Sequence, residues 1–199
     1  MSTHAGARPP VIVHGMLDAM HDEEQRAQEA SRAEKIALLR NVGSLRPLSR
    51  ELLVDVSARC EWVEHRINHV AQVQGELPEA VLIQSTGVTT VMRRLDGTSR
   101  DESEPRFLVL DQPGMGTVFG SRAIIRGFGS KCSLVCDSPC RFLSLRRDLL
   151  KRCPRKVMNA FLDADPDVPR DAMLLSMLDD ATEWRNYASS YSDSAVAEQ

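Results

Sequence analysis

The sequence predicts an α+β fold in which a β-roll, a jelly-roll barrel, is flanked by N- and C-terminal helices. Residues 18–41 contain neither glycine nor proline and are rich in helix-forming residues. Residues 60–144 hold short runs of valine, isoleucine and threonine separated by glycine or polar turns. After Leu145 the composition favours helices again. This order places the strands in one barrel with helices on either side.

The N-terminal segment, residues 1–17, is predicted to be an extended arm. Pro9 and Pro10 precede an apolar run, Val11, Ile12 and Val13, which makes these three residues candidates for binding a partner. A disordered tail is the commoner state of such a terminus and is the favoured alternative. Residues 18–41 follow as the N-terminal helix, whose apolar stripe is thin before Ile36.

The next elements lead into the roll. Gly43 is expected to end the first helix, and Ser49 to cap a second helix over residues 51–58. The expected strands are residues 81–83, 88–92, 107–110, 131–136 and 140–145. Asp96-Gly97 and the polar run that ends at Pro105 predict a hairpin loop. The spacing of these strands suits a barrel or jelly roll.

The C-terminal extension is predicted to be helical, with breaks at Pro154 and in the acidic loop 163–167. A final helix is expected to begin near Pro169. Its apolar stripe consists of Met173, Leu174, Met177, Leu178, Trp184, Tyr187 and Tyr191. Such a stripe favours packing against the roll. The alternative is a protruding helix that binds a partner through Trp184, Tyr187 and Tyr191.

One stretch, Val118 to Leu134, is typical of a loop that holds an anion. Phe119 and Gly120 open a turn into a short helix over residues 122–125, and a glycine-rich loop then returns the chain to a strand. Such a turn aims backbone N–H groups at a ligand, and the helix N-terminus adds about half a positive charge. A small phosphate would fit there.

This stretch resembles the cyclic nucleotide-binding domain family, of the protein kinase A regulatory subunit type. The family's F-G-E-(small)-A-L cassette, followed by Arg and two small residues, is matched by residues 119–124 and 131–133. The run from Gly75 to Val88 follows a second family motif with the same glycine spacing. The resemblance covers residues 36–152. It implies four segments: 1–17, 18–41, a cyclic nucleotide-binding-like domain at 42–152, and 153–199.

The resemblance also implies a nucleotide pocket, but one that is degenerate. Its residues would be Gly87, Phe119, Gly120, Ser121, Arg122, Ala123, Lys131, Cys132 and Ser133. Ser121 replaces the family's glutamate and Lys131 its arginine, whose two-donor fork an ammonium cannot reproduce. Two weakened contacts remove roughly 3 to 5 kcal/mol, so a micromolar site becomes roughly millimolar. We therefore expect no cofactor, disfavour cAMP and cGMP, and expect Lys131 to be a solvated side chain.

Two further clusters suggest metal sites, and both are better explained without a metal. Cys132, Cys136 and Cys140 are spaced four residues apart and would share one face of a strand, which favours core packing. His65 and His69 lack the closely spaced histidine pair of a cupin site and are expected to be solvated. With no arrangement of nucleophile, base and oxyanion donors, the sequence does not predict an enzyme.

Composition limits the classes of partner. A formal net charge of -3 and an apolar fraction of 42% do not indicate nucleic acid or membrane binding. No apolar stretch of about twenty residues and no signal pattern occurs, so a cytoplasmic location is expected. The five cysteines, an odd number, favour a reducing compartment.

The function expected from these features is that of a structural or adaptor subunit whose partners are other protein subunits. The segment after Arg152 is acidic and too short for the DNA-binding domain of a transcription regulator. Small rolls with helical extensions resemble components of cilia and flagella, so an axonemal or cytoskeletal assembly is expected by analogy. The alternative is a sensor that binds a cyclic nucleotide, a nucleoside or another small anion and closes residues 155–191 over it. The oligomeric state is left open.

Overall fold

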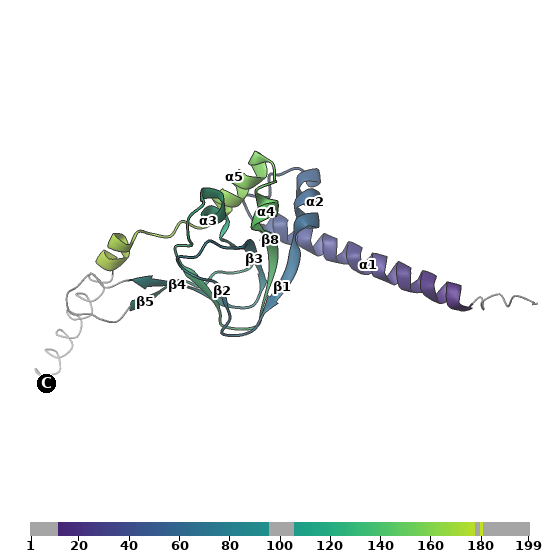
Figure 1. The fold of residues 1–199 in the computed structure, drawn as a ribbon, viewed down its shortest axis with the longest axis horizontal. Helices are drawn as coiled ribbons and strands as arrows, with labels where there is room; N and C mark the ends of the chain where they lie inside the picture. Colours follow the sequence, from purple (N-terminus) through teal and green to yellow (C-terminus); the bar gives the residue numbers. More distant parts are fainter. Residues whose placement is uncertain (1–11, 96–105, 178–179, 181–199) are drawn as a thin grey trace, which may run out of the picture.

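The structure, a computed structural model, describes residues 12–95, 106–177 and 180 (Figure 1). The strands are β1 (Glu61–His65), β2 (Val70–Gln72), β3 (Ala80–Thr86), β4 (Thr89–Leu95), β5 (Arg106–Asp111), β6 (Val118–Phe119), β7 (Ser133–Cys136) and β8 (Cys140–Arg146). The helices are α1 (Ile12–Asn41), α2 (Arg50–Arg59), α3 (Ser121–Arg126), α4 (Arg147–Leu150) and α5 (Arg155–Ala164).

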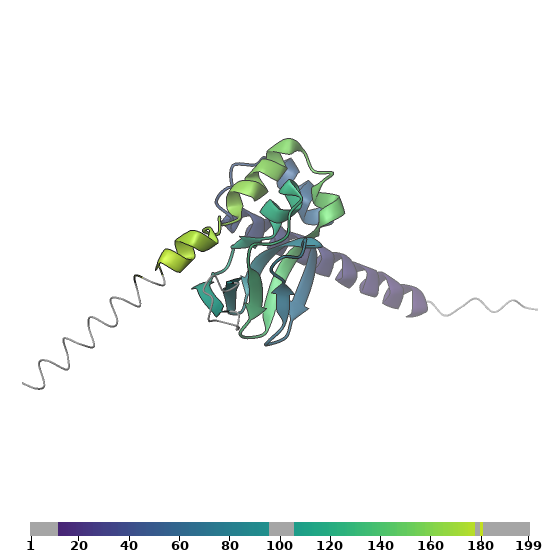
Figure 2. The ribbon, with the colours of Figure 1, turned by 60° about the vertical axis from the view of Figure 1, so that its left-hand side comes forward.

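The strands form two antiparallel sheets of four. One sheet has the order β1-β8-β3-β6, and the other has the order β2-β7-β4-β5. Helices α2, α3, α4 and α5 gather at one end of the strands, as both ribbon views show (Figures 1 and 2). The predicted α+β fold with a β-roll between helices is confirmed.

The core consists of two clusters of buried side chains. The first joins the helices to one sheet and includes Leu39, Leu53 and Phe161. The second fills the roll and consists of Leu82, Val91, Phe119, Cys132, Leu134, Cys136, Cys140 and Phe142. All three predicted core cysteines belong to the second cluster, and the prediction of core packing is confirmed. The ranges 12–95 and 106–177 contain no group of three side chains suited to hold a metal ion.

The first helix begins earlier than the sequence predicted. Helix α1 starts at Ile12 instead of Asp18, so the predicted extended arm is wrong from residue 12 onward. Proline suits the entrance to a helix, and Pro10 stands just before this start. In the following turns Gly15 lowers helix propensity most, by about 1 kcal/mol relative to alanine. Much of α1 projects away from the roll, and its residues 23–30 are exposed (Figure 1).

The partner-binding candidates near both termini are only partly placed. Ile12 and Val13 lie in the first turn of α1, whereas Val11 lies outside the described residues. Trp184, Tyr187 and Tyr191 also lie outside the described part of the chain. The last helical stretch covers residues 171–177, starting two residues after Pro169. In that stretch Leu174 is buried, while Met173 and Met177 are exposed.

Several local predictions hold in detail. Ser49 caps α2, and its Oγ accepts a hydrogen bond from the Leu52 N–H at 3.4 Å. Strands β4 and β5 pair directly from Leu95 to Arg106, on either side of the predicted hairpin loop, which itself lies outside the described residues. Strands β1 and β2 had no place among the expected strands; they are short and pair with β8 and β7. None of the described helices is long and apolar enough to span a membrane.

Candidate functional site

The predicted anion loop is built around Gly120, between β6 and α3. Its φ of +83° lies in the left-handed region, which residues other than glycine adopt only with strain. A Cβ atom at this position would lie 2.9 Å from Gln72 Oε1 and 3.2 Å from the Ala80 carbonyl oxygen. Gly127, with a φ of +74°, ends α3. The turn and its short helix are therefore present, and the helix extends one residue beyond the prediction at each end.

Ser121 faces the C-terminal helix from the buried side of α3. Its side chain is fully buried, and its Oγ lies 2.6 Å from the Phe161 carbonyl oxygen and 3.1 Å from Asp165 Oδ2. Both neighbours are acceptors, so the single hydroxyl proton is shared between them. The residue in the family's glutamate position thus ties α3 to the end of α5.

The carboxylate of Asp165 occupies the mouth of the anion loop. Asp165 follows α5 and is 9% exposed, and its Oδ2 accepts a hydrogen bond from the Arg122 backbone N–H at 2.7 Å. Burial raises the pKa of Asp165 from its ordinary value, while the hydrogen bonds from Arg122 and Ser121 act in the opposite direction. A carboxylate of the chain therefore accepts a backbone N–H of the loop that the sequence predicted to hold a small phosphate.

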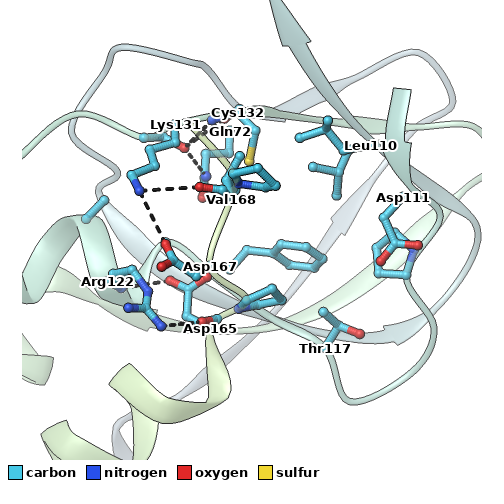
Figure 3. A pocket seen from close by; sticks show the side chains of 18 of the residues that line it. Gln72, Leu110, Asp111, Thr117, Arg122, Lys131, Cys132, Asp165, Asp167 and Val168 are labelled. Carbon is cyan, nitrogen blue, oxygen red and sulfur yellow. Dashed lines mark hydrogen bonds and ion pairs between the residues drawn. The ribbon is translucent and has the colours of Figure 1, made fainter. Parts of the chain in front are cut away.

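The sequence suggested that Lys131 is a free, solvated side chain, but its ammonium group has partners in the structure. Its Nζ lies 3.2 Å from Asp167 Oδ1 and donates to the Val168 carbonyl oxygen at 3.4 Å (Figure 3). The prediction was wrong because the chain after α5 turns back across the pocket. The ammonium lowers the pKa of Asp167 from its ordinary value.

Two arginines hold the same C-terminal stretch. Arg93 on β4 is largely buried; its Nη2 pairs with Asp171 Oδ1 at 2.5 Å and its Nη1 donates to the Pro169 carbonyl oxygen at 3.3 Å. Arg122 Nη2 donates to the carbonyl oxygens of Leu162 and Asp165, at 3.3 and 3.0 Å. We call residues 165–171 the strap. Its residues 166–170 form no helix or strand.

A cavity of about 240 Å³ remains between the strap and the roll. Val168 packs against the core cluster inside the roll and so closes part of this space. Gln72 lines the cavity and is 8% exposed, and its Oε1 has no hydrogen-bond partner within the described residues. Asp111 and Thr117 add polar groups to the lining (Figure 3). The walls are otherwise mainly apolar, with Val91, Leu110 and Phe119 among them.

The structure gathers most of the predicted pocket residues but not all of them. Those that line the cavity are Phe119, Gly120, Arg122, Ala123, Lys131 and Cys132. Ser121 lies behind them. Gly87 lies against Pro139 and Cys140, and its φ of +93° explains why glycine is needed there. Ser133 lies outside the lining and accepts a hydrogen bond from the Gln74 N–H at 3.0 Å.

Sequence reasoning missed the strap and the residues of β2, β4 and β5 that line the cavity. Gln72 and Leu110 carried no signal, because β2 and β5 contribute only one or two lining residues each, from distant parts of the chain. The acidic loop 163–167 did carry a signal. Its carboxylates face the basic residues of the anion loop, and the sequence analysis had treated them only as a break between helices.

The two histidines of β1 and the following turn form a pair on the surface. The rings of His65 and His69 stack with their centroids 4.1 Å apart, and His65 also contacts Phe142. Partial burial lowers the pKa of His65, and the neighbouring His69 adds to this effect. The prediction of unremarkable solvated histidines therefore needs correction for His65, which is half-buried.

Comparison with known proteins identifies the fold. No protein-family profile matches the sequence, and no curated protein matches it significantly. Solved structures do match. The regulatory domain of Toxoplasma gondii protein kinase A with cAMP has a TM-score of 0.60 at 17% identity, covering 67% of this chain and 49% of that chain.

Two other solved structures are similar. The regulatory subunit of a cAMP-independent protein kinase A from Trypanosoma cruzi, bound to guanosine, has a TM-score of 0.58 at 17% identity, over 77% of this chain and 51% of that chain. A cyclic nucleotide-binding domain from Methylobacillus flagellatus has a TM-score of 0.54 at 18% identity, over 78% of this chain and 79% of that chain. The chain spans about half the length of the kinase regulatory structures. Its described residues adopt a cyclic nucleotide-binding-like fold.

Proposed function

We propose that this protein is a non-catalytic adaptor subunit whose cyclic nucleotide-binding-like pocket does not sense cyclic nucleotides. One observation carries the proposal: the Asp165 carboxylate accepts the Arg122 N–H and lies beside the Ser121 hydroxyl, where a ligand phosphate would have to bind. A nucleotide must displace this buried carboxylate before it can bind. It would then meet an ammonium in place of the arginine fork, which weakens binding further.

The similar structures support this proposal only in part. One of them, from Trypanosoma cruzi, is a regulatory subunit described as cAMP-independent. A role in binding other proteins agrees with the projecting helix α1, whose residues 23–30 are exposed to solvent. The larger assembly that we propose is of the ciliary or flagellar axonemal kind, by analogy with other small rolls that carry helical extensions.

Calorimetric titration with cAMP and cGMP tests whether the pocket senses nucleotides. We expect no binding tighter than about ten micromolar. Tighter binding that Lys131→Ala abolishes would overturn the proposal. Lys151→Ala is the matched control, because Lys151 is exposed and lies at the end of α4, outside the cavity lining.

Co-purification tests the adaptor role separately. The full chain is compared with a chain that lacks residues 1–17 and with one that lacks residues 169–199. Loss of defined partners from either truncated chain supports the proposal, and recovery of the same partners by both counts against it. Axonemal components among those partners would support the proposed setting, and their absence would remove it.

A nucleoside is a second candidate ligand, because a cavity remains although the phosphate position is filled. The cavity of about 240 Å³ offers apolar walls and the unpaired Gln72 Oε1. A neutral ligand without a phosphate would not compete with Asp165. One similar structure, from Trypanosoma cruzi, is bound to guanosine. Titration with guanosine and adenosine would show saturable binding that Gln72→Ala weakens; no binding at millimolar nucleoside excludes this candidate.

A further inference from the structure

The strap is held by contacts that recognise a peptide backbone as well as its charges. Arg93 forms an ion pair with the Asp171 carboxylate and donates a hydrogen bond to the main-chain carbonyl of Pro169. Lys131 does the same with Asp167 and the carbonyl of Val168. Hydrogen bonds to main-chain carbonyls are available to any extended peptide, whereas the ion pairs select acidic side chains.

Arg122 also holds a carboxylate and a main-chain carbonyl at the start of the strap, but it binds the carboxylate through its backbone N–H and not through its charged side chain. Its backbone N–H binds the Asp165 carboxylate, and its guanidinium binds the Asp165 carbonyl oxygen. Three basic residues, from β4, α3 and the start of the β7 region, therefore hold three carboxylates and three main-chain carbonyls in order along the strap. Carboxylates alone could be held by chance surface pairs; the paired carbonyl contacts indicate a site shaped for a chain.

Between the charged contacts, one apolar side chain enters the roll. Val168 packs against the cluster that contains Leu134 and Phe142. Pro166 and Pro169 stand on either side, and proline restricts the backbone to extended conformations. A peptide that is already extended loses little conformational entropy on binding. The strap thus presents acidic residues around one partly buried aliphatic residue.

The contacts of the strap are of a strength that permits exchange. The Lys131–Asp167 pair is exposed, with side chains 39% and 68% accessible, and Asp171 is 59% accessible. Exposed ion pairs contribute little to stability. Segments with few buried apolar contacts open at low free energy without unfolding the rest of a protein.

We propose that the pocket is a binding site for acidic, extended peptides. The strap of the same chain occupies this site, and a partner's peptide of the same chemistry binds there when the strap leaves. The proposal rests on the adaptor role and names the class of partner segment for it. The ligand is an extended segment with carboxylates around one aliphatic residue, as in Asp165-Pro166-Asp167-Val168-Pro169.

Fluorescence anisotropy with a labelled synthetic peptide of residues 163–173 tests this inference on the full chain. The strap is opened by the triple substitution Asp165→Ala, Asp167→Ala, Asp171→Ala. We expect saturable binding to this variant, about tenfold weaker binding to the wild type, and loss of binding when Arg93→Ala and Lys131→Ala are added. A peptide with asparagine at the three aspartate positions should bind neither protein.

Two results would overturn the inference. One is no binding to a triple variant that circular dichroism shows to be folded; the other is equal binding of the asparagine peptide. If the triple variant does not fold, Asp167→Ala takes its place, because it removes only the exposed pair. We expect the peptide to bind this variant about threefold more tightly than it binds the wild type. Equal binding to the two proteins would contradict the inference. Failure here leaves the nucleotide titration unchanged, whereas tight cAMP binding by the wild type would defeat the adaptor proposal itself.

Discussion

Two substituted residues in the anion loop have taken up contacts with the protein's own chain. Ser121 is too short to reach out of the pocket, and its hydroxyl instead lies against Phe161 and Asp165. Lys131 keeps a positive charge and forms an ion pair with Asp167. Phe161 belongs to α5, and Asp165 and Asp167 follow it, so both residues tie the C-terminal region to the roll.

The buried Asp165 predicts an unusual dependence of stability on pH. Its pKa is raised above 3.8, so the folded state binds protons more readily than the unfolded state. The stabilising contribution is fully present below pH 3.8 and is lost as pH rises through the folded pKa. Thermal unfolding across this range should show the difference between wild type and Asp165→Asn shrinking with rising pH. A difference that grows with pH would show that the hydrogen bonds outweigh burial.

Gly120 offers a direct test of the loop geometry. Gly120→Ala should lower the free energy of unfolding by at least about 1 to 3 kcal/mol, because its φ is positive and a Cβ would press on Ala80 and Gln72. Gly114→Ala is the control, since nothing lies within 4 Å of a Cβ there and its φ is not positive. Urea unfolding measures both. Equal effects of the two substitutions would contradict the described turn.

At the scale of elements, helix α5 anchors the strap while the strap itself is only lightly held. Val157 and Phe161 of α5 are fully buried in the first core cluster, whereas Pro166 and Asp167 are exposed. The strap can therefore open from a fixed point at Ala164, the last residue of α5, which packs against the same cluster. Opening would also free the helical stretch 171–177, which already exposes Met173 and Met177.

Hydrogen–deuterium exchange should separate these two parts. The amides of Asp167, Val168 and Arg170 are expected to exchange much faster than those of β8, whose residues pair with both β1 and β3. Lys131→Ala should speed exchange in the strap by no more than about fivefold, because the pair it removes is exposed. Lys151→Ala should leave the strap unchanged. If the strap amides were protected as strongly as those of β8, the strap would not open and could not be replaced by a partner peptide.

The individual elements were predictable because their signals are local. Ser49 before an apolar run marked the start of α2. Runs of apolar and β-branched residues marked β3 and β4, and Phe142, Leu143 and Leu145 marked β8. The start of α1 was misplaced because the valine and isoleucine residues after Pro10 favour extended backbone on their own. Strands β1 and β2 have three to five residues each and form through pairing with β8 and β7.

At the scale of the whole molecule, the site depends on contacts that no local pattern encodes. Ser121 meets Asp165 across 44 residues of sequence, and Arg93 meets Pro169 across 76. The sequence predicted the turn at Gly120 and the short helix after it, and most of the predicted pocket residues line one cavity. It did not reveal what fills the pocket, because the strap has neither helical nor strand periodicity.

The arrangement of the molecule separates a closed pocket from a projecting helix. The strap covers one side of the roll, while α1 leads away from the helical end (Figures 1 and 2). A partner could bind α1 without disturbing the pocket, and an acidic segment of a partner could compete with the strap. This division suits an adaptor better than a nucleotide switch.

The central claim is that Asp165 occupies the position of a ligand phosphate, and the NMR signal of the Arg122 amide tests it most directly. The amide proton shift should titrate with a pKa above 3.8, because the hydrogen bond to Asp165 weakens when the carboxyl group is protonated. The titration should vanish in Asp165→Asn. Addition of about 100 micromolar cAMP should not shift the signal. An Arg122 amide that ignores Asp165→Asn, or that shifts on adding cAMP, would contradict the account.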